Sequence, residues 1–113
     1  MVSKTPVFAV EGHDVTAFID RVHAGWGLEP IDVERNTYRL FTSDGTELRL
    51  SVERGQTVVT DDVLGIAPEF LADRLRYYLR AVPPTRRTLD DQALDKATLA
   101  ELVDEFCSVE PPE

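Results

Sequence analysis

Apolar residues recur at the spacing of an amphipathic helix in three stretches of the chain. The first stretch predicts a helix over residues 14–24, with Asp14 as its N-cap and Gly25 as the residue that ends it. The second predicts a helix that starts at Pro68 and stops before Pro83, because proline suits a first helical turn and breaks a helix interior. The apolar positions that define these two stripes are Val15, Phe18, Ile19 and Val22, and then Leu71, Leu75, Tyr78, Leu79 and Val82.

The third stretch covers residues 90–107 and carries its apolar residues on one helical face. Thr98 followed by Glu101 matches a capping box, in which a side chain at each position caps the backbone of the other. The pattern therefore fits either one helix or two helices that meet near Lys96. Residues 110–113 are expected to form a frayed acidic C-terminal end.

Strands are predicted in the first two thirds of the chain. Residues 37–42 and 47–52 flank an Asp-Gly pair, the strongest short signal for a β-hairpin, and residues 57–60 follow as a third strand. Residues 31–33 are predicted as an edge strand, and the apolar run 7–10 as a buried strand or a packed segment. Residues 1–109 are thus expected to form a single α+β domain, in which an antiparallel β-meander of three to four strands packs with about three helices.

Composition and charge narrow the function. The 113 residues carry a formal net charge of −9 with a pI near 4.6, which argues against binding to nucleic acid. No apolar run approaches the ~18 residues that a membrane span needs. The N-terminus shows no signal peptide, and Cys107 is the single cysteine. We therefore expect a cytoplasmic protein with no membrane or nucleic-acid partner.

The charge is divided into three segments. Residues 1–71 carry −6, residues 72–89 carry +4 and residues 90–113 carry −7. The basic segment contains Arg74, Arg76, Arg80, Arg86 and Arg87. This arginine block is interpreted as a solvated helix face and loop that can pair with the acidic tail, with a phosphate site as the alternative.

Catalytic chemistry is not visible in the sequence. His13 and His23 are ten residues apart, which is too far for the i, i+4 pair that shares a metal on one helix. Cys107 stands among acidic residues, which disfavours a reactive thiolate. Phosphate-loop, nucleotide-binding and serine-elbow motifs do not occur, and an enzyme would need a catalytic set assembled from distant residues. We expect no enzymatic activity, no cofactor and no metal.

Trp26 lies between two glycines at the end of the first predicted helix. The interpretation that we favour packs its ring over the core, with the indole N–H hydrogen bonded to one partner. The alternative is an exposed anchor at an interface with another protein.

Several short motifs stand between residues 22 and 82, namely Gly25-Trp26, Tyr38-Arg39-Leu40, Asp44-Gly45-Thr46-Glu47-Leu48-Arg49-Leu50, Val58-Val59 and Tyr78-Leu79. Together, these motifs resemble actinobacterial immunity proteins of polymorphic toxin systems. The nearest group is the antitoxins of tuberculosis-necrotizing-toxin-type NAD glycohydrolases. This resemblance implies a non-enzymatic immunity or inhibitor protein that binds the catalytic domain of a cognate toxin and blocks its active site, and it assigns no contact residue.

Acidic groups at the predicted hairpin tips are the candidate partner-binding residues, because exposed loops on a rigid scaffold suit binding and acidic charge steers a basic partner. Arg54 is the candidate bidentate anchor among them. The alternative function is a chaperone-like or regulatory adaptor that carries a protein client. The acidic candidates are Asp44, Glu53, Asp61, Asp62 and Glu69.

Overall fold

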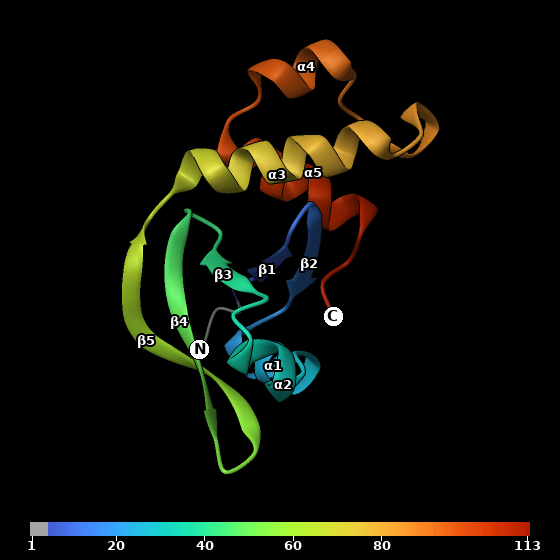
Figure 1. The fold of residues 1–113 in the computed structure, drawn as a ribbon. Coiled ribbons are helices and arrows are strands. Elements are labelled where there is room, and N and C mark those ends of the chain that lie inside the picture. The colour runs from blue at the N-terminus through green and yellow to red at the C-terminus, as the bar shows by residue number, and fades with distance from the viewer. Residues whose placement is uncertain (1–4) are drawn as a thin grey trace.

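The structure is a computed structural model that describes residues 5–113; residues 1–4, to which the expectation about a signal peptide refers, lie outside the described residues. It is an α+β fold in which helices lie on both faces of one antiparallel sheet (Figure 1). The strands are β1 (Val7–Glu11), β2 (Asp14–Phe18), β3 (Arg39–Thr42), β4 (Thr46–Glu53) and β5 (Gln56–Ile66). The helices are α1 (Arg21–Gly27), α2 (Pro30–Glu34), α3 (Pro68–Ala81), α4 (Asp91–Lys96) and α5 (Leu99–Val109), with a 3-10 turn at Pro84–Arg86.

The sheet has the strand order β2-β1-β3-β4-β5. The apolar run 7–10 is the buried strand β1, and its side chains alternate between two cores. Phe8 and Val10 face the core that α3 and α5 cover, whereas Val7 and Ala9 face the core beneath α1 and α2. The class and the antiparallel sheet agree with the sequence, but residues 5–113 form five strands rather than three or four and five α-helices rather than about three.

The helix predicted over residues 14–24 is wrong in its first half. Residues 14–18 form β2, which pairs with β1 through a two-residue turn at Gly12 and His13. Gly12 has a φ of +59°, the left-handed conformation that such a hairpin turn requires. Asp14 is therefore a strand residue. The N-cap of α1 is Asp20, whose carboxylate accepts the backbone N–H of His23 at 2.9 Å.

Two further predictions about strands are corrected. Residues 31–33 lie in helix α2, which begins at Pro30, so the proline starts a helix instead of flanking a strand. The third strand of the hairpin region does not end before Asp61. β5 runs on to Ile66, and Asp61 and Asp62 lie within it, opposite Arg49 at a β-bulge.

The remaining elements match the sequence pattern. Gly45 closes the β3–β4 hairpin with a φ of +87°, and a Cβ there would lie 2.4 Å from the Cα of Pro68. The hairpin turn is thus packed against the start of α3, and the Ala67 N–H donates to the Gly45 carbonyl at 2.8 Å. The 90–107 stretch forms two helices, with both halves of the predicted capping box present at Thr98 and Glu101.

The last residues are held against the sheet rather than frayed. The Glu113 N–H donates to the Ala17 carbonyl at 2.9 Å, and the Ile19 N–H donates to the Glu113 carbonyl at 2.9 Å. These bonds extend the backbone pairing of β2 to the chain end, which lies beside β2 in Figure 1.

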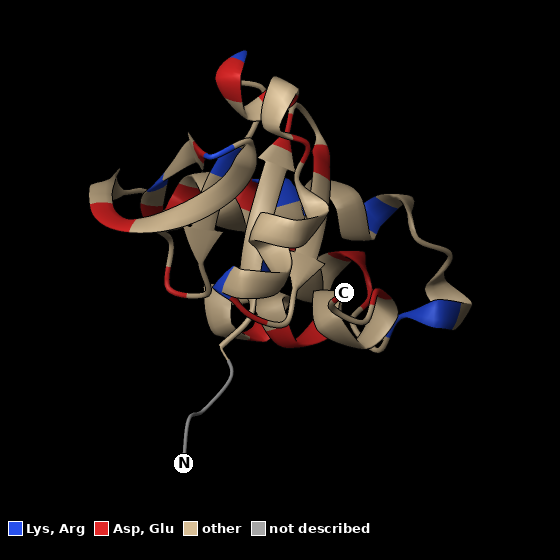
Figure 2. Ribbon diagram, turned by 90° about the horizontal axis from the view of Figure 1, so that it is seen from below, with Lys and Arg blue, Asp and Glu red and all other residues tan. Residues whose placement is uncertain are grey.

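The arginine block contacts the acidic tail within the molecule. Arg80 pairs with Asp95, Arg87 pairs with Asp91 at 3.2 Å, and Arg86 lies 3.9 Å from Glu110. Figure 2 shows basic and acidic segments interleaved around the molecule, without one dominant basic patch. Internal contacts therefore account for Arg80, Arg86 and Arg87 without a phosphate ligand, whereas Arg74 lies over the Phe70 ring and no hydrogen-bond partner of its buried Nε is seen among the described residues.

Candidate protein-binding surface

The Gly25-Trp26-Gly27 motif sets how α1 sits on the sheet. A Cβ on Gly25 would lie 2.7 Å from the Thr57 carbonyl oxygen of β5, and a Cβ on Gly27 would lie 2.4 Å from the Phe18 ring. Ala24, nearly opposite Trp26 around the helix, is fully buried. These three small residues thus let α1 approach the sheet closely, and the side chain of Trp26 points outward.

Trp26 is the most exposed of the large aromatic side chains among residues 5–113, with 73% of its area accessible. The prediction that its ring packs over the core is therefore wrong. The His23 ring lies against the indole, with 4.9 Å between ring centroids, and its Nδ1 lies 2.7 Å from the Asp20 carboxylate. The indole is supported on one side by a hydrogen-bonded neighbour and is open to solvent on the other.

Contacts along its length fix α1 to β5. The Arg21 guanidinium donates to the Asp61 carboxylate at 2.5 Å, at the start of the helix. The buried Thr57 hydroxyl donates to the Leu28 carbonyl at 2.8 Å, just after the helix ends. The buried Thr57 bond and the close approach of Gly25 to β5 therefore hold the platform that carries Trp26 in place before any partner binds.

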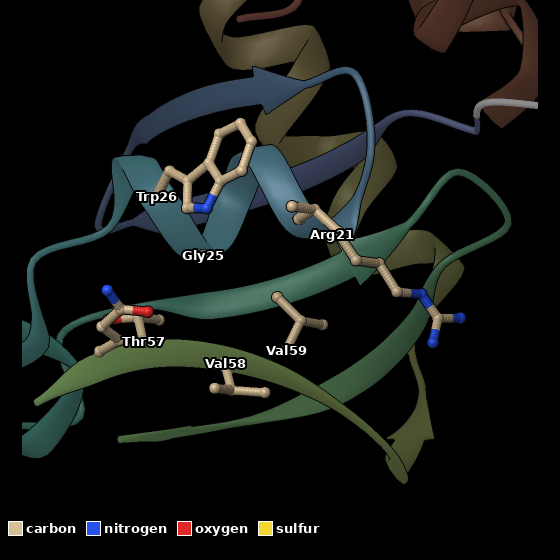
Figure 3. A pocket seen from close by; sticks show the side chains of 8 residues that line it. Arg21, Gly25, Trp26, Thr57, Val58 and Val59 are labelled. Atoms are coloured by element: carbon tan, nitrogen blue, oxygen red, sulfur yellow. The ribbon is translucent and has the colours of Figure 1, made fainter. Parts of the chain in front are cut away.

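Shallow hollows flank the indole. One of about 240 Å³ lies between α1 and the start of β5 and is lined by Trp26 on the helix and by Thr57, Val58 and Val59 on the strand (Figure 3). Another of about 270 Å³ lies toward α2 and is lined by Glu29 and Pro30. We define the Trp26 surface as Trp26 with Arg21 and Val22 of α1 and residues 56–59 of β5.

Two of the predicted binding residues lie away from this surface. Asp44 is in the β3–β4 turn, where its carboxylate accepts the Thr42 hydroxyl and the Thr46 N–H. The Thr42 hydroxyl, with the Thr46 contacts, lowers the pKa of Asp44 below its usual range. Glu69 is exposed in the first turn of α3. Asp44 thus has a structural role in a turn that packs against α3, whereas no partner of Glu69 is seen among the described residues.

The other four predicted residues lie along β4 and β5. Glu53 and Arg54 are at the exposed tip of the β4–β5 hairpin, where Arg54 takes a φ of +52°. Asp61 pairs with Arg21 of the Trp26 surface, and Asp62 lies 3.6 Å from Arg49. The fold therefore brings one of the predicted residues, Asp61, into direct contact with the surface that the exposed tryptophan marks.

A larger hollow of about 340 Å³ lies on the opposite side of the molecule, beside the end of α3. His13 stacks on Tyr77 there, with 4.4 Å between ring centroids, and the Tyr78 hydroxyl donates to Glu110 at 2.7 Å. Burial raises the pKa of Tyr78, and the Glu110 carboxylate raises it further. Its aromatic and carboxylate groups contact one another, so we rank this hollow below the Trp26 surface.

Metal binding, thiol chemistry and membrane spanning can each be considered for residues 5–113. Within that range, His, Cys, Asp and Glu side chains form no group of three or more that could hold a metal ion. Burial, with the nearby Asp104 charge, raises the pKa of the Cys107 thiol, which disfavours the reactive thiolate. Also among these residues, no helix combines the length and the apolar character that crossing a membrane requires.

Comparisons with protein-family models, with curated proteins and with solved structures returned no match to this chain. The site therefore rests on its own geometry. Trp26, the central residue of the site, stands out in the sequence, but the sequence favours packing of its ring over the core. The signal that could have corrected this is the pair of flanking glycines, since glycine within a helix often marks close backbone packing and leaves the intervening side chain facing away.

Proposed function

We propose that this protein is a non-enzymatic inhibitor of the immunity type, which binds the catalytic domain of a toxin through the Trp26 surface. The observation that carries the proposal is the exposed tryptophan on a platform fixed to the sheet by the close approach of Gly25 and by the buried Thr57 hydroxyl. Tryptophan is the side chain most enriched at the energetic centres of protein interfaces. A rigid platform also reduces the entropy lost on binding, which suits a tight one-to-one inhibitor.

The charge around the indole defines the partner that fits it. Glu29 lines one flanking hollow and Glu53 lies at the end of β4, while Asp61 is paired with Arg21, within a chain of net charge −9. Such a field steers a partner whose binding surface is basic and raises its association rate at low salt. The partner is expected to present an apolar cavity for the indole inside a basic rim.

The test uses the product of the gene adjacent to the one that encodes this chain. Co-expression is expected to give a one-to-one complex and to protect cells from a toxic neighbour. Trp26→Ala should weaken that complex by about 30-fold or more, since centres of this kind contribute ~2 kcal/mol or more.

Tyr77→Ala is the matched control, because Tyr77 is an exposed aromatic residue on α3, away from the Trp26 surface. Its affinity for the neighbour should stay within about threefold of the wild type. Equal effects of the two substitutions, or a toxic neighbour that never binds this chain, would overturn the proposal.

A further inference from the structure

The last part of β5 exposes a run of apolar residues on the margin of the sheet. The exposed fraction is 59% for Val63, 52% for Leu64 and 74% for Ile66. Large apolar side chains exposed this close together form a patch that a strand at a protein surface does not normally leave in water. We define residues 63–66 as the β5 edge segment. It is separate from the Trp26 surface, which uses residues 56–59 at the opposite end of the same strand.

The outer edge of this segment is unpaired in the sheet formed by residues 5–113. β5 pairs with β4 on one side and ends the strand order on the other. Figure 1 shows β5 as the outermost strand, with open space beyond it at the α3 end. An unpaired edge presents backbone N–H and C=O groups in a row, and an extended chain is the partner that satisfies such a row.

Acidic residues stand at both ends of the β5 edge segment. Asp61 and Asp62 precede it, and Glu69 follows it in the first turn of α3. The side chains of Asp61 and Asp62 are 97% and 73% exposed even with Arg21 and Arg49 beside them. Ion pairs as exposed as these exchange readily for other partners in water.

We propose that the β5 edge segment binds an extended strand of another protein, apolar at its centre and basic at both ends. A second copy of this chain fits less well, because each copy carries a net charge of −9 and the acidic flanks would approach one another. The contact is short. β-Bulges interrupt the β4–β5 ladder on both sides of Val63, which confines regular pairing to a few residues.

A synthetic peptide, Lys-Lys-Val-Thr-Val-Thr-Val-Lys-Lys, is a suitable probe, titrated into the full chain while the backbone amides are followed by NMR. Binding below about 1 mM is expected, with the largest shifts at residues 63–66. A version with N-methyl groups on the five central residues lacks N–H groups on both edges of the strand and should not bind. A version with glutamate for lysine should bind about tenfold more weakly.

Two double variants complete the design. Leu64→Ser with Ile66→Ser removes exposed apolar area without a charge change and should weaken peptide binding about tenfold. Val22→Ser with Ile31→Ser is the matched control, since both residues are exposed apolar side chains on α1 and α2, and it should leave peptide binding unchanged. Trp26→Ala should also leave it unchanged, which separates this proposal from the proposed function.

Three results would overturn the inference. They are no shift at residues 63–66 up to about 1 mM peptide, equal binding of the N-methylated peptide, and shifts centred on the Trp26 surface. Sedimentation that shows a dimer broken by Leu64→Ser with Ile66→Ser would assign the edge to a second copy instead.

Discussion

The two faces of the sheet use their side chains in different ways. On one face lies the helical layer, which consists of α3, α4, α5 and the linker 83–90. Arginine side chains and helix caps of this layer form hydrogen bonds with its own backbone. Arg76 donates to the carbonyls of Leu94 and Ala97, each at 2.9 Å, and Arg87 donates to those of Val82 and Leu89. On the other, the open side (α1, α2 and β5) exposes Trp26, Ile31 and Ile66. Polar groups of the helical layer stabilise the fold, whereas the open side carries apolar groups that the fold does not need.

The largest expected effect breaks the helical layer. Phe106 is fully buried and packs edge-to-face against Phe8 and Tyr78. Phe106→Ala should lower the free energy of unfolding by about 4 kcal/mol, because it removes a ring and leaves a cavity. Trp26→Ala should change it by less than about 1 kcal/mol, since the indole is exposed. Denaturant unfolding followed by circular dichroism measures both, and similar losses would contradict the division into two faces.

A smaller effect concerns the buried carboxylate of the helical layer. Glu105 is 5% exposed and accepts the Thr88 N–H at 2.7 Å and the Leu89 N–H at 3.0 Å. Burial alone would raise the pKa of Glu105, but the Thr88 hydroxyl, these backbone N–H groups and the Arg87 charge together hold it below its usual value. Glu105→Gln should therefore cost about 2 kcal/mol of unfolding free energy at neutral pH.

The same substitution has a defined pH dependence. A carboxyl with a lowered pKa in the folded protein stabilises fully above its unfolded pKa of about 4.3 and stops doing so as the pH falls through the folded value. The difference in unfolding free energy between the wild type and Glu105→Gln should therefore become smaller in acid. Unfolding free energies measured from pH 7 downward test this, and a constant difference would show that the charge of Glu105 is not what holds the linker.

Gly25→Ala tests the platform of the open side. The added Cβ would lie 2.7 Å from the Thr57 carbonyl oxygen, so α1 must shift, and we expect a loss of about 1 kcal/mol after the gain in helix propensity. Gly65→Ala on β5 is the control, because a Cβ there meets no atom within 4 Å. Thermal unfolding distinguishes the two, and equal stability of both variants would argue against a fixed platform.

Asp61→Asn should have the smallest effect on stability. The Arg21–Asp61 pair is exposed, so its loss should change the unfolding free energy by no more than about 0.5 kcal/mol. Its effect is expected in association instead. The rate of binding to a basic partner should fall, and should fall less steeply with added salt than that of the wild type. Stopped-flow mixing measures this, and unchanged kinetics would remove Asp61 from the interface.

The sequence predicts the helical layer better than the open side. Strong local signals specify the C-terminal helices, namely Pro68 at the start of α3 and the capping box at Thr98. Residues 14–22 are ambiguous, because their apolar spacing fits a helix while Val15 and Thr16 also suit a strand. Pairing with β1 decides the outcome, and no local pattern reports a partner strand.

The candidate site was harder to predict for the same reason. Acidic residues at turns are visible in a sequence, but whether Asp61 lies in a loop or in a strand depends on how β5 pairs with β4. Trp26 stands out in the sequence because it lies between two glycines. Its exposure, however, depends on the contact of Gly25 with β5 and on the contact of Gly27 with Phe18. Both depend on strand register and tertiary packing, which a local sequence pattern does not specify.

The most direct test of the central claim uses Trp26 itself, since it is the only tryptophan of the chain. Fluorotryptophan incorporated into this protein alone gives one fluorine NMR signal, and its shift between light and heavy water reports solvent contact at the indole. We expect the full solvent shift in the free protein and its loss in the complex with the product of the adjacent gene. An indole shielded in the free protein, or still in contact with water in the complex, would contradict the assignment of the Trp26 surface.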